Sequence, residues 1–293
     1  MNIIAILLAI TLSSSAFSSY LRLPPKKEQA IKQDAPIEHF HWDPQTKIMW
    51  LIGSKSLWRW NTSNNKLQKV RHPIIKVKTF VSHTDDYIWI STKNRLVGID
   101  KAELKEVTHS IEIGGEIYGL HEWGNKLIIN TNHAVISVNP ADLSQYEKKP
   151  RQISRPSYFG GRFLWSYEKG LQITDKHGTS KPILKCSTGK DKPAFTQNSV
   201  IYFCKNKFYR FSMNGKLIQV IPNLGATKIS AWSFDDLTHS FQFQNKVLEV
   251  FDLKSENRQT FLLHHKLDKL EVHGSIIAGL SNNIPVLEVL PTP

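Results

Sequence analysis

The stretch Ile48-Met49-Trp50-Leu51-Ile52-Gly53-Ser54-Lys55-Ser56-Leu57-Trp58-Arg59-Trp60-Asn61 decides the fold, because its pattern recurs further along the chain. The same order of apolar and polar residues returns without a gap over residues 87–100, and again over residues 126–139. Three copies at one regular spacing of about 40 residues are the signature of a repeat architecture.

Each copy consists of an apolar run, a short polar turn, and a second run that ends in an apolar residue followed by Asn or Asp. Asn and Asp adopt turn conformations that other residues adopt poorly, so this pattern predicts strands joined by tight turns, a β-meander. Weaker copies follow over residues 162–175, 199–212, 240–252 and 275–290.

The repeats number seven, which predicts an all-β fold: a seven-bladed β-propeller of four-stranded antiparallel blades over residues 37–293. Continuously apolar runs such as Ile88–Ile90 are expected where both faces of a strand are covered by neighbouring sheets. Residues 37–42 are expected to form the innermost strand of the first blade, and residues 287–290 to supply the last strand. Four tryptophans are expected to pack between blades: Trp50, Trp58, Trp60 and Trp89.

The run Ile88-Trp89-Ile90-Ser91-Thr92 with Leu96 resembles the propeller repeat of bacterial two-component-regulator sensor domains, and more loosely the quinoprotein-type repeats. The glycine that often precedes this leucine is present as Gly170 before Leu171, whereas Ser56 and Arg95 replace it in the first two units. The resemblance implies a bacterial exported β-propeller repeat protein. It implies no active site, because these repeats encode blades.

The N-terminus predicts export to the periplasm or beyond the cell. Residues 1–20 combine an apolar run with small residues, as in a secretory signal peptide in which Ser14 and Ala16 suit the −3 and −1 positions. No Lys or Arg precedes Ile3, so a retained anchor or a buried strand stays an alternative. Residues 21–36 are polar and contain three prolines, which indicates a linker. The rest of the chain has no apolar run of about 20 residues, the length that a membrane span needs.

The two cysteines, Cys186 and Cys204, leave two readings open. An exported protein with an even number of cysteines permits a disulfide, whereas free cysteines are also common in protein cores. The spacing does not match the Cys-x-x-Cys pattern of zinc sites.

The net charge of +13 is the main indication of function. In a propeller, the turns between second and third strands share one face with the connections between blades, and basic residues gather in these segments. The predicted binding residues are Lys55, Lys93, Arg95, Lys148, Lys149, Arg151, Lys169, Lys205, Lys207 and Lys246. Such a face would attract an acidic protein or an anionic component of the cell envelope, and no nucleic-acid recognition motif is present. The alternative is that these lysines only keep strand edges solvated.

Catalysis and metal binding have weaker support. Glu116, His121, Glu271 and His273 could approach a central channel, and His39-x-His41 and His264-His265 are the closest histidine pairs. No nucleophile elbow, zinc-binding helix or phosphate-binding loop accompanies them, so no catalytic residue, metal or cofactor is assigned. The sequence thus predicts a non-catalytic binding or scaffold propeller. A channel-centred hydrolase or lyase, and a structural subunit of a larger envelope assembly, are the alternatives.

Overall fold

The structure is a computed structural model that describes residues 19–290 with short gaps. The gaps are residues 35, 54–55, 71–80, 85, 92–95, 105, 109–112, 124–125, 151–156, 161–162, 167–169, 176–178, 187–192, 196–197, 206, 223–228, 235–237 and 244–245. Within the described ranges, no helix has the length and apolar character to cross a membrane.

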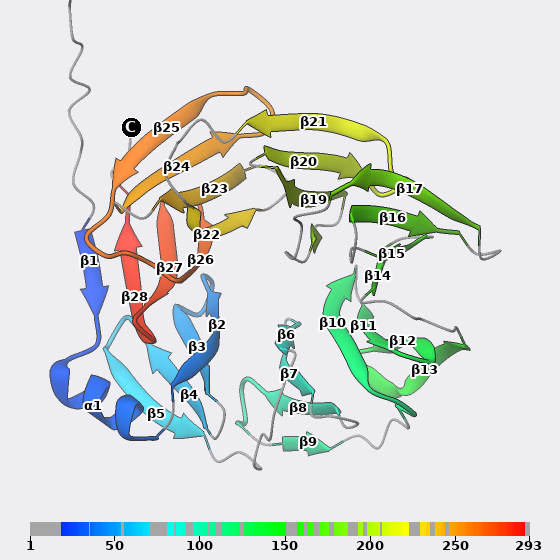
Figure 1. Ribbon diagram of the computed structural model, residues 1–293. Coiled ribbons are helices and arrows are strands. Elements are labelled where there is room, and N and C mark those ends of the chain that lie inside the picture. Colours follow the sequence, from blue (N-terminus) through cyan, green and yellow to red (C-terminus); the bar gives the residue numbers. More distant parts are fainter. Residues whose placement is uncertain are drawn as a thin grey trace, which may run out of the picture. The chain divides into compact units, whose positions relative to one another are not determined.

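The larger of two compact units covers residues 23–226 together with residues 234–236. Its described strands form five four-stranded antiparallel sheets, each built from four strands that are consecutive in the chain (Figure 1). The first two sheets contain β2 (Ile37–Asp43), β3 (Ile48–Gly53), β4 (Leu57–Asn61) and β5 (Lys66–Val70), then β6 (Val81–His83), β7 (Tyr87–Ser91), β8 (Leu96–Asp100) and β9 (Glu106–Thr108). The third and fourth contain β10 (Ile117–Trp123), β11 (Lys126–Thr131), β12 (Ala134–Asn139) and β13 (Asp142–Pro150), then β14 (Ser157–Gly160), β15 (Phe163–Ser166), β16 (Gly170–Thr174) and β17 (Ser180–Lys185). The fifth contains β18 (Ala194–Phe195), β19 (Ser199–Cys204), β20 (Lys207–Ser212) and β21 (Leu217–Pro222).

The smaller unit covers residues 1–22, 227–233 and 237–293, and its described strands form two further four-stranded sheets. One contains β22 (Ile229–Phe234), β23 (Thr238–Phe243), β24 (Val247–Asp252) and β25 (Arg258–Leu262) in chain order. The other has the order β1-β28-β27-β26, with β1 (Ser19–Arg22), β26 (Lys269–His273), β27 (Ile276–Ser281) and β28 (Ile284–Val289).

The expectation of a seven-bladed propeller over residues 37–293 is therefore corrected. Each copy does lie in a four-stranded sheet, but the described sheets divide into groups of five and two in two compact units. The structure describes five blades in one unit and two in the other, and not seven blades in one unit. The correction has a physical reason, because a repeat period fixes the strands of one sheet and does not fix how many sheets pack as one body.

The last sheet is also completed differently from the expectation. Its outer strand is β1, in which Tyr20 pairs with Glu288 and Arg22 with Val286, and residues 287–289 belong to its third strand, β28. Among its described residues, the expected linker over residues 21–36 contains the end of β1 and the helix α1 (Pro25–Asp34). This helix begins at a proline and buries Ile31. Lys69 on β5 forms an ion pair of 2.6 Å with Asp34 at the end of α1.

Middle strands are buried on both faces, as the continuous apolar runs predict. On β7, Ile88 and Ile90 join the core shared with β3 and β4, while Trp89 between them joins the core shared with β11 and β12. Successive side chains of a strand point to opposite faces, so one strand contributes to two cores. All four tryptophans that were expected to pack between sheets are buried.

The Asn or Asp that ends several of the third strands closes a turn. Asn61, Asp100 and Asp252 each accept backbone N–H groups from residues two and three positions later, at 2.6 to 3.3 Å. At Asp252 the N–H and hydroxyl of Ser255 and the N–H of Lys254 lower the pKa of the carboxyl. Each of these side chains therefore supplies a local acceptor that starts the turn to the outer strand.

Cys186 and Cys204 form a disulfide with an S–S distance of 2.05 Å. Cys186 directly follows β17 and Cys204 ends β19, so the bond joins two neighbouring sheets of the larger unit. Both cysteines are buried in the core that these sheets share, together with Leu171, Tyr202 and Phe211. The bond thus fastens an interface that apolar packing already forms.

We expect the double variant Cys186→Ala/Cys204→Ala to lose about 3 kcal/mol of stability, because the bond closes a loop of 18 residues. Urea unfolding under oxidising conditions measures this loss. A reducing agent should lower the stability of the unmodified protein by a similar amount and leave that of the variant unchanged. Equal stability of the two proteins under oxidising conditions would contradict the prediction.

Candidate functional site

Four of the ten predicted binding residues have described side chains, and all four are exposed: Lys148, Lys205, Lys207 and Lys246. Lys149 lies in β13, but its side chain is not among those described. The remaining five lie outside the described residues: Lys55, Lys93, Arg95, Arg151 and Lys169. The structure therefore locates only part of the expected basic face.

Lys205 and Lys207 are the two predicted residues that the structure brings together. They flank the turn between β19 and β20, and Lys205 has a left-handed backbone with φ of 49°. In the described part of the chain, neither lysine forms an ion pair. Lys148 lies on another sheet, and Lys246 is engaged locally, since its Nζ donates to the carbonyl oxygen of His264 at 3.0 Å.

The sheet that carries Lys205 and Lys207 has no acidic residue. No Asp or Glu occurs between Asp191 and Asp235, a range that includes all of β18, β19, β20 and β21. Arg210 and Lys216 add further positive charge to the same sheet. Local positive charge without compensating carboxylates favours an anionic partner.

The outer strand β21 of this sheet exposes apolar side chains. Leu217 is 48% exposed, Ile218 51% and Val220 39%. Lys207 is the cross-strand partner of Pro222 at one end of β21, and Lys216 immediately precedes the other end. The structure thus shows an exposed apolar strand with a lysine near each end. The sequence analysis, which considered only charge, did not predict this strand.

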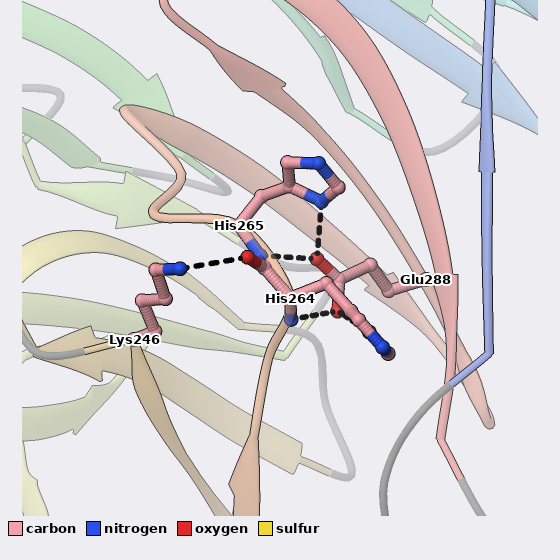
Figure 2. A network of polar contacts seen from close by, with 4 residues as sticks. All are labelled: Lys246, His264, His265 and Glu288. Carbon is pink, nitrogen blue, oxygen red and sulfur yellow. Dashed lines mark hydrogen bonds and ion pairs between the residues drawn. The ribbon is translucent and has the colours of Figure 1, made fainter.

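A second cluster surrounds the carboxylate of Glu288 in the smaller unit (Figure 2). Glu288 is fully buried on β28, and it accepts the backbone N–H groups of His264 and His265 at 2.9 Å each. The Nδ1 atom of His265 lies 3.1 Å from Oε1, and that of His264 lies 3.6 Å from Oε2. Tyr20 of β1 packs against both imidazole rings, with centroids 4.8 and 5.1 Å away.

Glu288 departs from the structural repeat. It is the next-to-last residue of the third strand of its sheet. In the other described sheets this position holds a buried apolar residue: Trp60, Ile99, Val138, Ile173, Phe211 or Phe251. A carboxylate here must be hydrogen-bonded to offset its lost hydration.

The Glu288 cluster is better suited to holding the structure together than to chemistry. Its hydrogen bonds fix the connection between β25 and β26 onto β28, and Tyr20 fixes β1 over the same place. Within the described ranges, no group of three or more His, Cys, Asp or Glu side chains is arranged to hold a metal ion. The histidine pair that the sequence offered as a metal candidate is thus bound to a carboxylate.

The residues suggested for a channel are only partly brought together. Glu271 and His273 lie two residues apart on the edge strand β26, and Oε2 of Glu271 is 3.5 Å from Nε2 of His273. Both side chains are about a third exposed. Glu116 is exposed elsewhere in the larger unit, and the side chain of His121 is not among those described. Of the four residues suggested for a channel, only Glu271 and His273 are therefore shown close together.

A depression of about 480 Å³ lies along the outer part of the third sheet. Its lining residues are Lys126, Ser137, Asn139, Gln145, Tyr146 and Glu147. The Oδ1 atom of Asn139 accepts the N–H of Ala141, and Gln145 donates to Asp142, so two of these amides serve the local turns. The lining carries mixed charge and does not continue the positive charge of the fifth sheet.

Comparison with known proteins identifies the fold and no family. No family model matches the sequence, and no curated protein matches it. Solved structures that are similar include the β-propeller domain of Cps50 (Swd1) from Myceliophteria thermophila, with a TM-score of 0.62, 10% identity, and coverage of 88% of this chain and 97% of that one.

Two bacterial structures are also similar. One is a catalytically inactive virginiamycin B lyase from Staphylococcus aureus with quinupristin, with a TM-score of 0.64, 12% identity, and coverage of 94% and 99%. The other is the extracellular domain of BT4673 from B. thetaiotaomicron, with a TM-score of 0.66 and 11% identity. The similar region covers 94% of this chain and 43% of the BT4673 chain. The chain is therefore an all-β propeller repeat protein, and identities this low show the fold alone.

We expect Glu288→Leu to destabilise the protein by about 2 to 4 kcal/mol, although it restores the apolar residue type of the repeat. The reason is that the N–H groups of His264 and His265 lose their acceptor in a buried place. Glu288→Gln keeps one carbonyl acceptor and should cost less. Thermal and urea unfolding measure both variants, and an unchanged or more stable Glu288→Leu protein would show that the carboxylate does not hold this connection.

Proposed function

We propose that this propeller is a non-catalytic binding module that docks an acidic protein or an anionic component of the cell envelope. The observation that carries the proposal concerns the fifth sheet. Its exposed residues Lys205 and Lys207 lie in a part of the chain that contains no Asp or Glu. Long-range attraction toward such a patch raises the rate at which an anionic partner is captured. Of the other predicted residues, Lys148 and Lys149 lie on the third sheet of the same unit, and Lys246 lies in the smaller unit.

The cell envelope is the proposed location. The apolar and small residues at the start of the chain are typical of a secretory signal, and Ser14 and Ala16 suit its cleavage site. Cleavage after Ala16 would leave all four residues of β1, Ser19–Arg22, in the mature protein. Removal of residues 1–20 would instead delete Tyr20, which packs against His264 and His265.

The double variant Lys205→Gln/Lys207→Gln should bind an acidic probe about 10-fold more weakly, since each lysine at the rim of an interface contributes a modest electrostatic attraction. The probe is a fluorescent polyglutamate peptide, and anisotropy at low and high salt measures its binding. The matched control is Lys66→Gln/Lys181→Gln, which removes the same charge from exposed lysines on other sheets.

Binding to the double variant should also depend less on salt, because exposed charges are screened as ionic strength rises. Equal losses in the double variant and in the control would show that only total charge matters, which contradicts the choice of this surface. Vesicles with and without anionic lipid, tested in the same way, separate a lipid target from an acidic protein.

A second candidate function is catalysis by the Glu271–His273 pair. A carboxylate 3.5 Å from an imidazole is a common general acid–base arrangement, and one of the proteins with a similar fold is a lyase. As a non-catalytic module, the protein should leave quinupristin unchanged when incubated with it, as followed by mass spectrometry. Turnover that disappears in Glu271→Gln and in His273→Asn would replace the binding proposal with the catalytic one.

A further inference from the structure

We propose that the outer strand β21 receives an extended, acidic peptide segment of a protein partner, which pairs with it as an additional β-strand. This proposal rests on the proposed function and specifies its partner. β21 lies at the end of the strand order in its sheet, so one side of its backbone faces no further strand among the described residues. An edge of this kind can take a peptide strand by β-augmentation.

The composition of β21 sets it apart from the other outer strands. Its sequence Leu-Ile-Gln-Val-Ile-Pro contains no charged residue. Each of the other described outer strands, β1, β5, β9, β13, β17 and β25, contains at least one Lys, Arg, Asp or Glu. Proteins place charges on edge strands to prevent pairing with other chains, and β21 lacks this protection within the strand.

The exposure of β21 fits a surface that a partner covers. Leu217, Ile218 and Val220 lie close together along one short strand, and each is more than a third exposed. The pairing with β20 shifts between Arg210 and Phe211, which leaves Ile218 without a cross-strand partner. Such a bulge gives the strand a local twist and directs the extra side chain outward. Contiguous exposed apolar residues mark interaction sites in soluble proteins.

The charges around β21 identify the chemistry of the segment that would cover it. Lys216 stands before the strand at one end, and Lys207 lies across from Pro222 at the other, with Lys205 just beyond. No Asp or Glu lies on this sheet to compensate these cations. A strand with acidic and apolar residues in alternation would place apolar side chains on β21 and carboxylates near the lysines.

The same charges disfavour a second copy of this chain as the occupant. Antiparallel pairing of two β21 strands would bring Lys216 of one copy near Lys205 and Lys207 of the other. Like charges that face each other across an interface are repulsive. A lipid or polysaccharide surface would use the lysines but would gain nothing from the backbone edge. An acidic peptide strand uses both features.

The test uses the full chain and a ten-residue peptide that alternates Glu and Val. Hydrogen–deuterium exchange should show protection of β21 amides when the peptide is present, because the two backbones become hydrogen-bonded. The same peptide N-methylated at alternate residues keeps its charge and cannot form the ladder. It should bind at least 10-fold more weakly and give no protection of β21.

The double variant Leu217→Thr/Ile218→Thr removes the apolar contacts, retains β propensity and leaves every charge in place. It should bind the Glu–Val peptide at least 10-fold more weakly. Its thermal midpoint should stay close to that of the unmodified chain, because both side chains are exposed. The matched control Leu262→Thr alters an exposed leucine on the outer strand β25 and should leave peptide affinity unchanged.

The outcomes separate the two proposals. If polyglutamate binds through Lys205 and Lys207, while the Glu–Val peptide gives no protection of β21 or binds equally well after N-methylation, strand pairing is wrong and basic docking stands. If neither peptide responds to any of these changes, both proposals fail. Protection of β21 that is lost in Leu217→Thr/Ile218→Thr and kept in Leu262→Thr supports strand pairing.

Discussion

The antiparallel pairing of β1 with β28 is the interaction on which the smaller unit depends. Three consecutive residues of β28, Val286, Leu287 and Glu288, are buried, so this strand cannot serve as the solvated edge of a sheet. β1 covers it with residues from the start of the chain. The two ends of the described chain are thereby held in one sheet. Long-range strand pairing of this kind is slow to form, because the loop that it closes is long.

The buried carboxylate of Glu288 belongs to the same constraint. Glu288 lies on β28, the strand that β1 covers, and it accepts the backbone N–H groups of His264 and His265 in the connection between β25 and β26. Tyr20 then covers the two histidines from β1. A polar group that breaks the apolar repeat is thus explained by satisfied hydrogen bonds, as buried polar groups generally are.

The outer strands have more freedom than the middle strands. Middle strands such as β7 contribute to two cores at once, so their residue types are fixed by packing. Outer strands have one edge toward solvent and can differ from sheet to sheet. The other outer strands contain charged residues. The strand β21 contains none and exposes apolar side chains, with a lysine near each end. The proposed function uses a part of the fifth sheet that packing leaves unconstrained.

Local features of this fold could be predicted from the sequence, whereas long-range features could not. The gapless recurrence of residues 48–61 predicted the four-stranded sheets, and the Asn or Asp at the end of several third strands predicted the turns that Asn61 and Asp252 close. The grouping of the sheets was wrong, because a repeat period does not determine it. β1 was missed because a strand of four residues contains no sequence signal for pairing with a strand at the far end of the chain. Glu288 and the acid-free fifth sheet could have been found by aligning the repeats and mapping Asp and Glu.

Truncation from the N-terminus tests most directly the claim that the start of the chain completes the last sheet. One protein lacks residues 1–18 and keeps β1, and the other lacks residues 1–22 and loses it. Urea unfolding should show the stability of the full chain in the first protein and a loss of several kcal/mol in the second, because β28 then becomes an uncovered edge. Equal stability of the two truncated proteins would contradict the account.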